Sequence, residues 1–255
     1  MINATTSLRE FTVSIRNHFY RREHAGNRKL ILNQPQLLST AGDIVRKSSD
    51  PLGAMRDFHL QQSLRIVDLY KQKKDPVLVA AQLAALRKTL AITSFRLAAA
   101  GENSNIALAL GGSTMRGDHT LLTDVDAIVV AYGEAERETA QRVQALMLKN
   151  MEAMALAADH VMPDHFAGLP FAGVPGKFPA VTMADLSDPE KKGVLLGNSS
   201  VYRISMDLHI LDTRGKVKRV DYHEQLESLR AKLIRDNPDV MLAMCLEIYE
   251  KEVER

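Results

Sequence analysis

The spacing of apolar positions divides the chain into a helical first part and a mixed second part. Upstream of residue 101, apolar residues recur at steps of three and four, which is the period of a helix face. The pairs Asp50-Pro51 and Asp75-Pro76 each combine an acidic N-cap with a proline at the first helical position. The pattern therefore predicts one helix after each pair, ending near Lys73 and near Ala100. The second helix is apolar on more than one face, so we expect it to be deeply buried.

Downstream of residue 101, short apolar runs alternate with a helical pattern, as in α/β domains. The expected elements are strands at 105–110 and 124–130, a helix from Glu134 to His160, a strand at 201–211, a turn at 212–215, a strand at 216–220 and two C-terminal helices. We therefore predict an α/β (α+β) fold with a small mixed sheet. Its expected parts are a helical region at 1–101, a catalytic domain at 102–221 and C-terminal helices at 222–255.

Composition narrows the class of protein. The 255 residues are 45% hydrophobic and 25% charged, which is ordinary for a globular protein, and the net charge of +2 does not favour nucleic-acid binding. The one cysteine, Cys245, fits a reducing compartment. The first residues do not resemble a signal peptide, and no uninterrupted apolar run reaches membrane-spanning length. We expect a cytoplasmic protein with no membrane contact.

Candidate chemistry lies between residues 111 and 126. Gly111 and Gly112 follow the first predicted strand and allow a tight turn close to a ligand, while Ser113 is suited to cap a short helix whose free amides favour phosphate. Asp124 and Asp126 open the second strand, and side chains two residues apart on a strand share a face. Paired carboxylates beside a phosphate cradle predict a site for a divalent cation that carries a nucleoside triphosphate.

This combination resembles the polymerase-β-type nucleotidyltransferase superfamily. Gly112-Ser113, ten intervening residues and then Asp124-Val125-Asp126 match its signature, and Arg116-Gly117-Asp118 is similar to the protein uridylyltransferases and to nucleotidyltransferases found beside cyclic-nucleotide-binding and CBS modules. The motif also resembles the minimal nucleotidyltransferases of toxin–antitoxin loci. The resemblance implies that Gly111, Gly112, Ser113 and Arg116 bind the nucleotide phosphates, Arg116 either contacting phosphate directly or pairing with Asp118.

The resemblance also implies a third metal-binding carboxylate on a nearby strand, and two residues compete for this role. Asp207 lies in the middle of the predicted strand at 201–211, where an unpaired charge is costly, and the segment from Tyr202 resembles the equivalent strand of glutamine-synthetase adenylyltransferases, although His209 stands where arginine is expected. Asp212 belongs to a Leu-Asp-x-Arg element similar to one in the uridylyltransferases, but a residue in the predicted turn also has a structural explanation. We favour Asp207.

The implied function is metal-dependent nucleotidyl transfer. We expect Asp124, Asp126 and Asp207 to bind Mg²⁺ (or Mn²⁺) and to catalyse transfer of a nucleoside monophosphate from ATP or UTP to a hydroxyl, on a protein rather than on a nucleic acid. Two alternatives stay open at this point: a catalytically weak module of the same fold that senses a nucleotide or binds a partner, and a toxin–antitoxin component.

Overall fold

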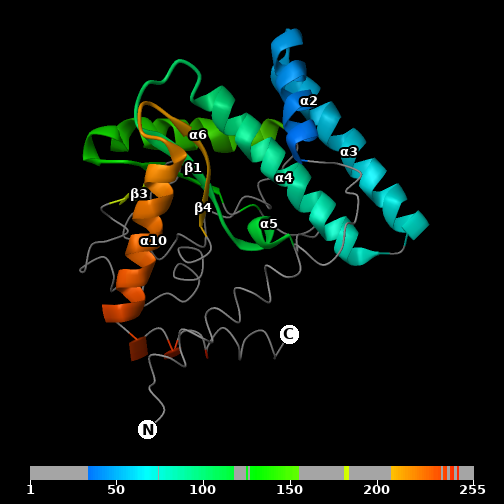
Figure 1. Ribbon diagram of the computed structural model, residues 1–255. Coiled ribbons are helices and arrows are strands. Elements are labelled where there is room, and N and C mark those ends of the chain that lie inside the picture. The colour runs from blue at the N-terminus through cyan, green and yellow to red at the C-terminus, as the bar shows by residue number, and fades with distance from the viewer. Residues whose placement is uncertain are drawn as a thin grey trace. The chain divides into compact units, whose positions relative to one another are not determined.

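A four-stranded mixed sheet lies at the centre of the described structure (Figure 1). The computed structural model describes residues 34–73, 75–117, 125, 127–154, 181–183 and 208–236, together with five residues between 238 and 246. The strand order is β3-β2-β1-β4, where the strands are β1 (Ile106–Leu110), β2 (Ala127–Ala131), β3 (Val181–Thr182) and β4 (His209–Arg214). β1 is antiparallel to both β2 and β4, whereas β2 and β3 are parallel. The predicted class, a mixed α/β fold with a small sheet, is confirmed.

Three helices precede the sheet: α2 (Gln34–Lys47), α3 (Pro51–Lys73) and α4 (Pro76–Ala98). Both predicted N-caps are present. The Asp50 carboxylate accepts a hydrogen bond from Gly53 N at 3.0 Å, and the Asp75 carboxylate accepts one from Leu78 N at 3.1 Å. These bonds satisfy amide groups of the first helical turn, which explains why the two helices begin where the Asp-Pro pairs predict. α2 was not anticipated as a separate element.

α4 is the most buried of these helices. Fourteen of its residues are buried, and it packs against α2, α3, α5 (Gly112–Arg116) and α6 (Arg137–Ala153). Ser94 Oγ donates a hydrogen bond to the carbonyl oxygen of Met147 at 2.6 Å, which joins α4 to α6. Within the described part of the chain, α4 is the one helix that by length and composition would be able to cross a membrane, but 67% of its most apolar window is buried inside the structure. That burial is what a core helix requires.

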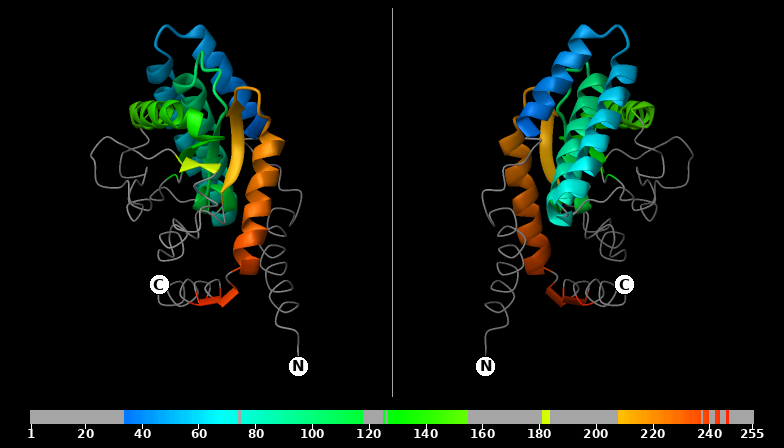
Figure 2. Two further views of the ribbon diagram at one scale, coloured as in Figure 1. Left: turned by 90° about the vertical axis from the view of Figure 1, so that its left-hand side faces the viewer. Right: turned by 90° about the vertical axis from the view of Figure 1, so that its right-hand side faces the viewer.

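The two faces of the sheet have separate hydrophobic cores, because side chains alternate along each strand. The face of Leu108, Leu110 and Val129 packs against α2, α3, α4 and α6. The opposite face, with Ala109 and Ile128, packs against α10 (Arg219–Asp236). Figure 2 shows α10 alongside β4, with α3 and α4 on the other side. In the segment predicted as a helix from Glu134 to His160, α6 and the residue that follows it contribute four side chains to the first core: Val143, Met147, Met151 and Met154.

The C-terminal part of the fold differs from the predicted hairpin. β4 continues through Arg214, so Asp212 lies within the strand and not in a turn. The turn comes at 215–217, and the segment predicted as a second strand at 216–220 instead enters α10. Gly215 has a φ of +83°, which permits this sharper change of direction, and Asp221 caps the helix by accepting a hydrogen bond from Lys218 N at 2.9 Å. The predicted turn at 212–215 and the predicted strand at 216–220 are therefore wrong.

Residues on both sides of the predicted boundary at 101/102 share one core, since α4 packs directly against β1 and α6. All described residues also fall in one compact unit, Leu32–Arg255. The division into parts at 1–101, 102–221 and 222–255 stays a prediction. Cys245 lies outside the described residues, as does the part of the predicted strand that precedes Leu208.

Candidate functional site

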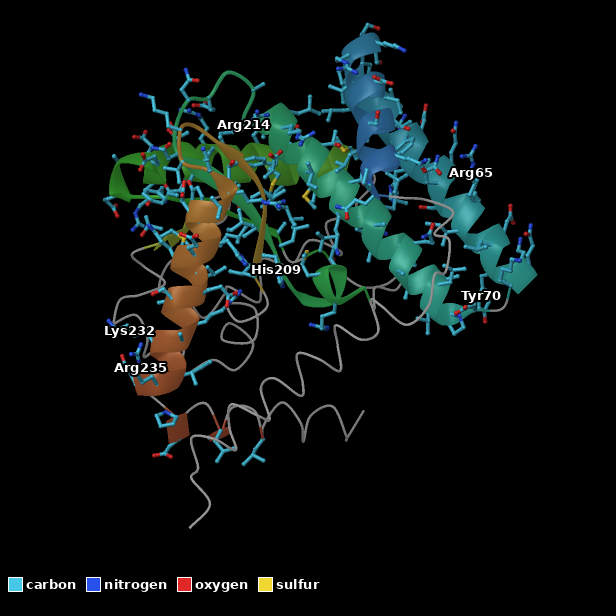
Figure 3. All side chains as sticks on the ribbon, in the orientation of Figure 1. Arg65, Tyr70, His209, Arg214, Lys232 and Arg235 are labelled. Carbon is cyan, nitrogen blue, oxygen red and sulfur yellow. The ribbon has the colours of Figure 1, made fainter. Side chains whose placement is uncertain are left out.

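Three strand ends meet at one edge of the sheet, and this edge is the candidate site. Leu110 at the end of β1 pairs with Ala127 at the start of β2 and with His209 at the start of β4. Figure 3 shows His209 at the end of β4 that lies toward α5. The glycine turn leaves this edge from β1, whereas the chain enters β2 and β4 here. Segments that are far apart in the sequence therefore converge at one place.

The glycine turn has the backbone geometry that the sequence predicts. Gly111 is buried, and Gly112 has a φ of +59°, in the left-handed region that favours glycine. The short helix α5 begins at Gly112 and ends at Arg116, and Gly117 with a φ of +82° terminates it. Thr114 is fully buried. The turn therefore brings the chain sharply away from β1 and keeps its backbone close to the sheet edge.

A side chain of α4 holds the helix α5, which follows the glycine turn. Lys88 Nζ donates a hydrogen bond to the carbonyl oxygen of Met115 at 3.4 Å, and Met115 packs against the main core. Sequence reasoning did not identify Lys88. A signal existed, because Arg87 and Lys88 interrupt an otherwise apolar stretch of α4, but the pattern alone does not say what the lysine contacts.

The start of β2 is fixed by a side chain and not only by its neighbouring strands. The amide of Gln144, on α6, accepts a hydrogen bond from Val129 N and donates one to the carbonyl oxygen of Ala127 at 3.4 Å. Gln144 is 4% exposed, and its two bonds occupy backbone groups that β3, which pairs only with Val130 and Ala131, does not reach. Val125, the residue between the two predicted metal ligands, is 1% exposed in the main core.

The predicted acidic ligands themselves are not described. Asp124, Asp126 and Asp207 lie outside the described residues, as does Asp118, and for Ser113 only the backbone position in α5 is described. Gly111, Gly112 and Arg116 are in place at the edge. Among the residues that the structure describes, no group of three or more His, Cys, Asp or Glu side chains is arranged to hold a metal ion.

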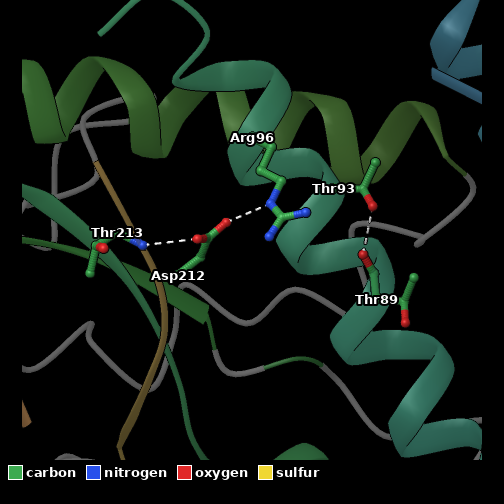
Figure 4. A network of polar contacts seen from close by, with 5 residues as sticks. All are labelled: Thr89, Thr93, Arg96, Asp212 and Thr213. Carbon is green, nitrogen blue, oxygen red and sulfur yellow. Dashed lines mark hydrogen bonds and ion pairs between the residues drawn. The ribbon is translucent and has the colours of Figure 1, made fainter. Parts of the chain in front are cut away.

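Asp212, the competing third carboxylate, is held by an ion pair (Figure 4). Arg96 Nε on α4 donates to Asp212 Oδ2 at 2.7 Å, and the backbone N of Thr213 donates to Oδ1 at 3.0 Å. The Asp212 side chain is 19% exposed, and the residue lies opposite Leu108, inside the strand and not at the edge where Leu110 pairs. Asp212 therefore joins β4 to α4 in this structure.

Residues 61–160 match a family model described as "Putative nucleotidyltransferase DUF294". The match covers less than half of the chain, and it includes α4, β1, α5, β2 and α6, the elements that form the candidate edge. No curated protein matches the chain. The match supports the nucleotidyltransferase superfamily and nucleotidyl transfer as the reaction class, at that coarse level.

Proposed function

We propose that this protein is a metal-dependent nucleotidyltransferase that moves a nucleoside monophosphate from ATP or UTP to a hydroxyl group, on a protein acceptor. The observation that carries the proposal is the convergence of three strand ends. The glycine turn leaves the edge at Leu110, Ala127 directly follows Asp126 in the chain, and Leu208, next to His209, directly follows Asp207. This placement supports the gathering of three carboxylates beside one turn.

The donor set suits the chemistry. Carboxylate oxygens are ligands that Mg²⁺ prefers, and ions held by Asp124, Asp126 and Asp207 would neutralise charge where an anionic hydroxyl oxygen attacks an anionic α-phosphate. Gly112 lets the backbone approach the phosphates, and Arg116 at the end of α5 offers a guanidinium to them. Lys88 and Gln144 act as positioning residues, because they hold α5 and the start of β2 in place.

Asp207 remains our choice for the third carboxylate because of where its neighbours lie. It directly precedes Leu208, and His209 pairs with Leu110 at the edge. Asp212 lies deeper in the strand and has Arg96 as a partner. If Asp212 were a metal ligand, its carboxylate would have to give up the ion pair with Arg96 in order to bind the cation.

The acceptor and the cellular setting are proposed from composition. The net charge is +2, and outside the basic segment at 1–30 no strongly basic stretch suits a nucleic-acid end, which supports a protein acceptor. One cysteine in 255 residues agrees with the cytoplasm. The alternative is a catalytically weak module that senses a nucleotide, and its motivation is that Asp207 and Asp212 compete as the third carboxylate.

Transfer of label from nucleotide to protein tests the proposal. The chain is incubated with Mg²⁺, a cell lysate and each of the four NTPs labelled at the α-phosphate, with γ-labelled ATP in parallel. Nucleotidyl transfer predicts label from the α-position only, and its loss in an Asp124→Asn/Asp126→Asn variant. Asp68→Asn, an exposed aspartate on α3, serves as the control that should keep activity. Binding of nucleotide without any transfer would favour the sensor, and transfer that survives the double substitution would refute the assignment.

A further inference from the structure

An arginine with two unsatisfied nitrogen atoms is buried in the helical layer of the described structure. Arg87 on α4 is only 4% exposed. Its Nε and Nη1 atoms form no hydrogen bond with any residue in the described part of the chain. A buried cation without a partner costs several kcal/mol, so such groups are normally paired. Arg87 therefore calls for an anion that the described residues do not supply.

The helices around Arg87 offer no buried carboxylate. α4 itself has no acidic residue. On the helices that pack against α4, every acidic side chain lies at or near the surface: Asp43, which pairs with Arg46, and Asp57, Asp68, Glu138 and Glu152. Asp212 pairs with Arg96, which follows Arg87 by nine residues and so projects from the opposite side of the helix.

Loss of the proton does not relieve this cost at neutral pH. Burial lowers the pKa of Arg87 to about 10, which leaves the guanidinium charged at pH 7. The positive charge is thus a lasting feature of this layer. Arginine also presents several donors in a rigid plane, a shape that suits phosphate oxygens.

A second unsatisfied polar group lies at the same level of the neighbouring helix. Gln62 stands eleven residues before the end of α3 at Lys73, and Arg87 stands eleven residues after the start of α4 at Pro76. The two helices run in opposite directions from their connection (Figure 1), so the residues lie about equally far along them. Gln62 is 5% exposed, and its Oε1 accepts no hydrogen bond from a described residue.

The end of α6 reaches the same level. His59, one turn from Gln62 on α3, is 5% exposed, and its Nδ1 is 3.0 Å from the carbonyl oxygen of Met154, which follows the end of α6. Arg87 shares its side of α4 with Ser94, seven residues on, which is bonded to α6. Buried polar groups of α3, of α4 and of the residue that follows α6 therefore lie at about the same level of the helical layer. The side-chain amide of Gln62, if reversed, would present a donor there.

We infer that Arg87 is the cationic centre of a buried oxyanion site between α3, α4 and α6, and that its ligand is a phosphoryl group with Gln62 as the second contact. The ligand is inorganic phosphate, pyrophosphate or a phosphate of a bound nucleotide. The inference does not rest on the proposed reaction.

Thermal unfolding of the full chain tests the inference. Circular dichroism melts are recorded with EDTA and at matched ionic strength in chloride, phosphate, pyrophosphate or ATP, using the Asp124→Asn/Asp126→Asn chain to remove binding at the proposed metal site. Near saturation, the ligand should raise Tm by about 5 °C. A rise in Tm with phosphate or pyrophosphate would identify a free anion as the ligand. A rise in Tm with ATP, but with neither of the two free anions, would identify a nucleotide as the ligand. No shift and no binding heat with any of them would overturn the inference.

Variants assign the response to Arg87. Arg87→Met should weaken the anion affinity about tenfold or more, whereas Arg65→Met, an exposed arginine of α3 (Figure 3), should leave it unchanged. If Arg87→Met does not fold, Arg87→Lys and Gln62→Leu are measured, and both should weaken binding several-fold. Equal anion response in these variants and the parent would overturn the inference. The inference would also be overturned if substitution of Arg87 lowered Tm by the same amount with and without anion. The protein itself would then supply the partner of this charge.

Discussion

The two ends of the sheet are held together in different ways. At the end where β1 begins, one side chain joins several segments: Asn105 Nδ2 donates to Glu136 at 3.2 Å, and Asn105 Oδ1 accepts from the backbone N of Lys216 at 2.8 Å and of Val217 at 3.1 Å. Gly215 passes so close to this group that an added Cβ would lie 2.5 Å from Asn105 Oδ1 and 2.7 Å from the carbonyl oxygen of Ser104. This end is closed by polar contacts that have no evident role in chemistry.

The other end carries the residues of the proposed reaction, and other elements hold it in place. The strand ends at Leu110, Ala127 and His209 lead to a glycine turn and to the acidic motifs, and the contacts that hold them come from behind, from Lys88 and Gln144. Under the proposed function, this difference predicts that stability and activity depend on opposite ends of the same sheet. Substitutions at the two ends should therefore separate the two properties.

The largest effect is expected from the third carboxylate. Asp207→Asn should lower kcat about a hundredfold or more, because it removes a metal ligand at the reacting atoms, with little change in Tm. Asp212→Asn should keep most of the activity and lower the stability slightly. Rates of α-label transfer and melts of both variants check this. The reverse outcome would make Asp212 the ligand and would mean that its ion pair with Arg96 opens when metal binds.

At the closed end, Gly215→Ala should destabilise the fold by roughly 2–4 kcal/mol, since alanine is strained at a φ of +83° and its Cβ meets backbone that cannot move away. Gly101→Ala is the matched control, because Gly101 has a φ of +80° with open space around it, and it should lose only the conformational part. Urea unfolding measures both. At low temperature, the specific activity of the Gly215→Ala variant should stay near that of the unsubstituted protein. A loss of activity without a loss of stability would show that this end of the sheet takes part in the reaction.

Gln144→Met is expected to act on both properties. It leaves the buried Val129 N and the Ala127 carbonyl without their partner, which should cost roughly 1–3 kcal/mol in the free energy of unfolding. Transfer activity should also fall several-fold, because the start of β2 loses its anchor. Gln141→Met, an exposed glutamine on the same helix, is the control for helix propensity. Equal behaviour of the two variants would show that Gln144 does not position β2.

The smallest effect is expected at the ion pair between α4 and β4. Arg96→Met should cost about 1 kcal/mol or less, because the arginine side chain is 50% exposed and its charge is solvated in either state. A double-mutant cycle with Asp212→Asn isolates the coupling between the two side chains. A coupling well above this value would show that β4 depends on the pair for its position.

Local signals in the sequence predicted the helices better than they predicted the last strand of the sheet, β4. The Asp-Pro caps located α3 and α4, and the apolar stripe located α6, because capping and helix periodicity act within a few residues. The predicted hairpin after Asp212 is wrong for the opposite reason. The contacts that extend β4 come from β1, and those that bend the chain at Gly215 come from Asn105, 110 residues earlier, so a local reading stopped the strand too soon.

The sequence by itself determined the glycine turn, the acidic motifs beside apolar strands and the mixed class of the fold, since these depend on residue types at short spacing. Only the tertiary structure decided the strand order β3-β2-β1-β4 and the register that brings Leu110, Ala127 and His209 to one edge. It also decided that Arg87 is buried and that Gln144 holds β2. These features depend on which distant surfaces pack together, and the pattern of apolar positions records that a face is buried but not what buries it.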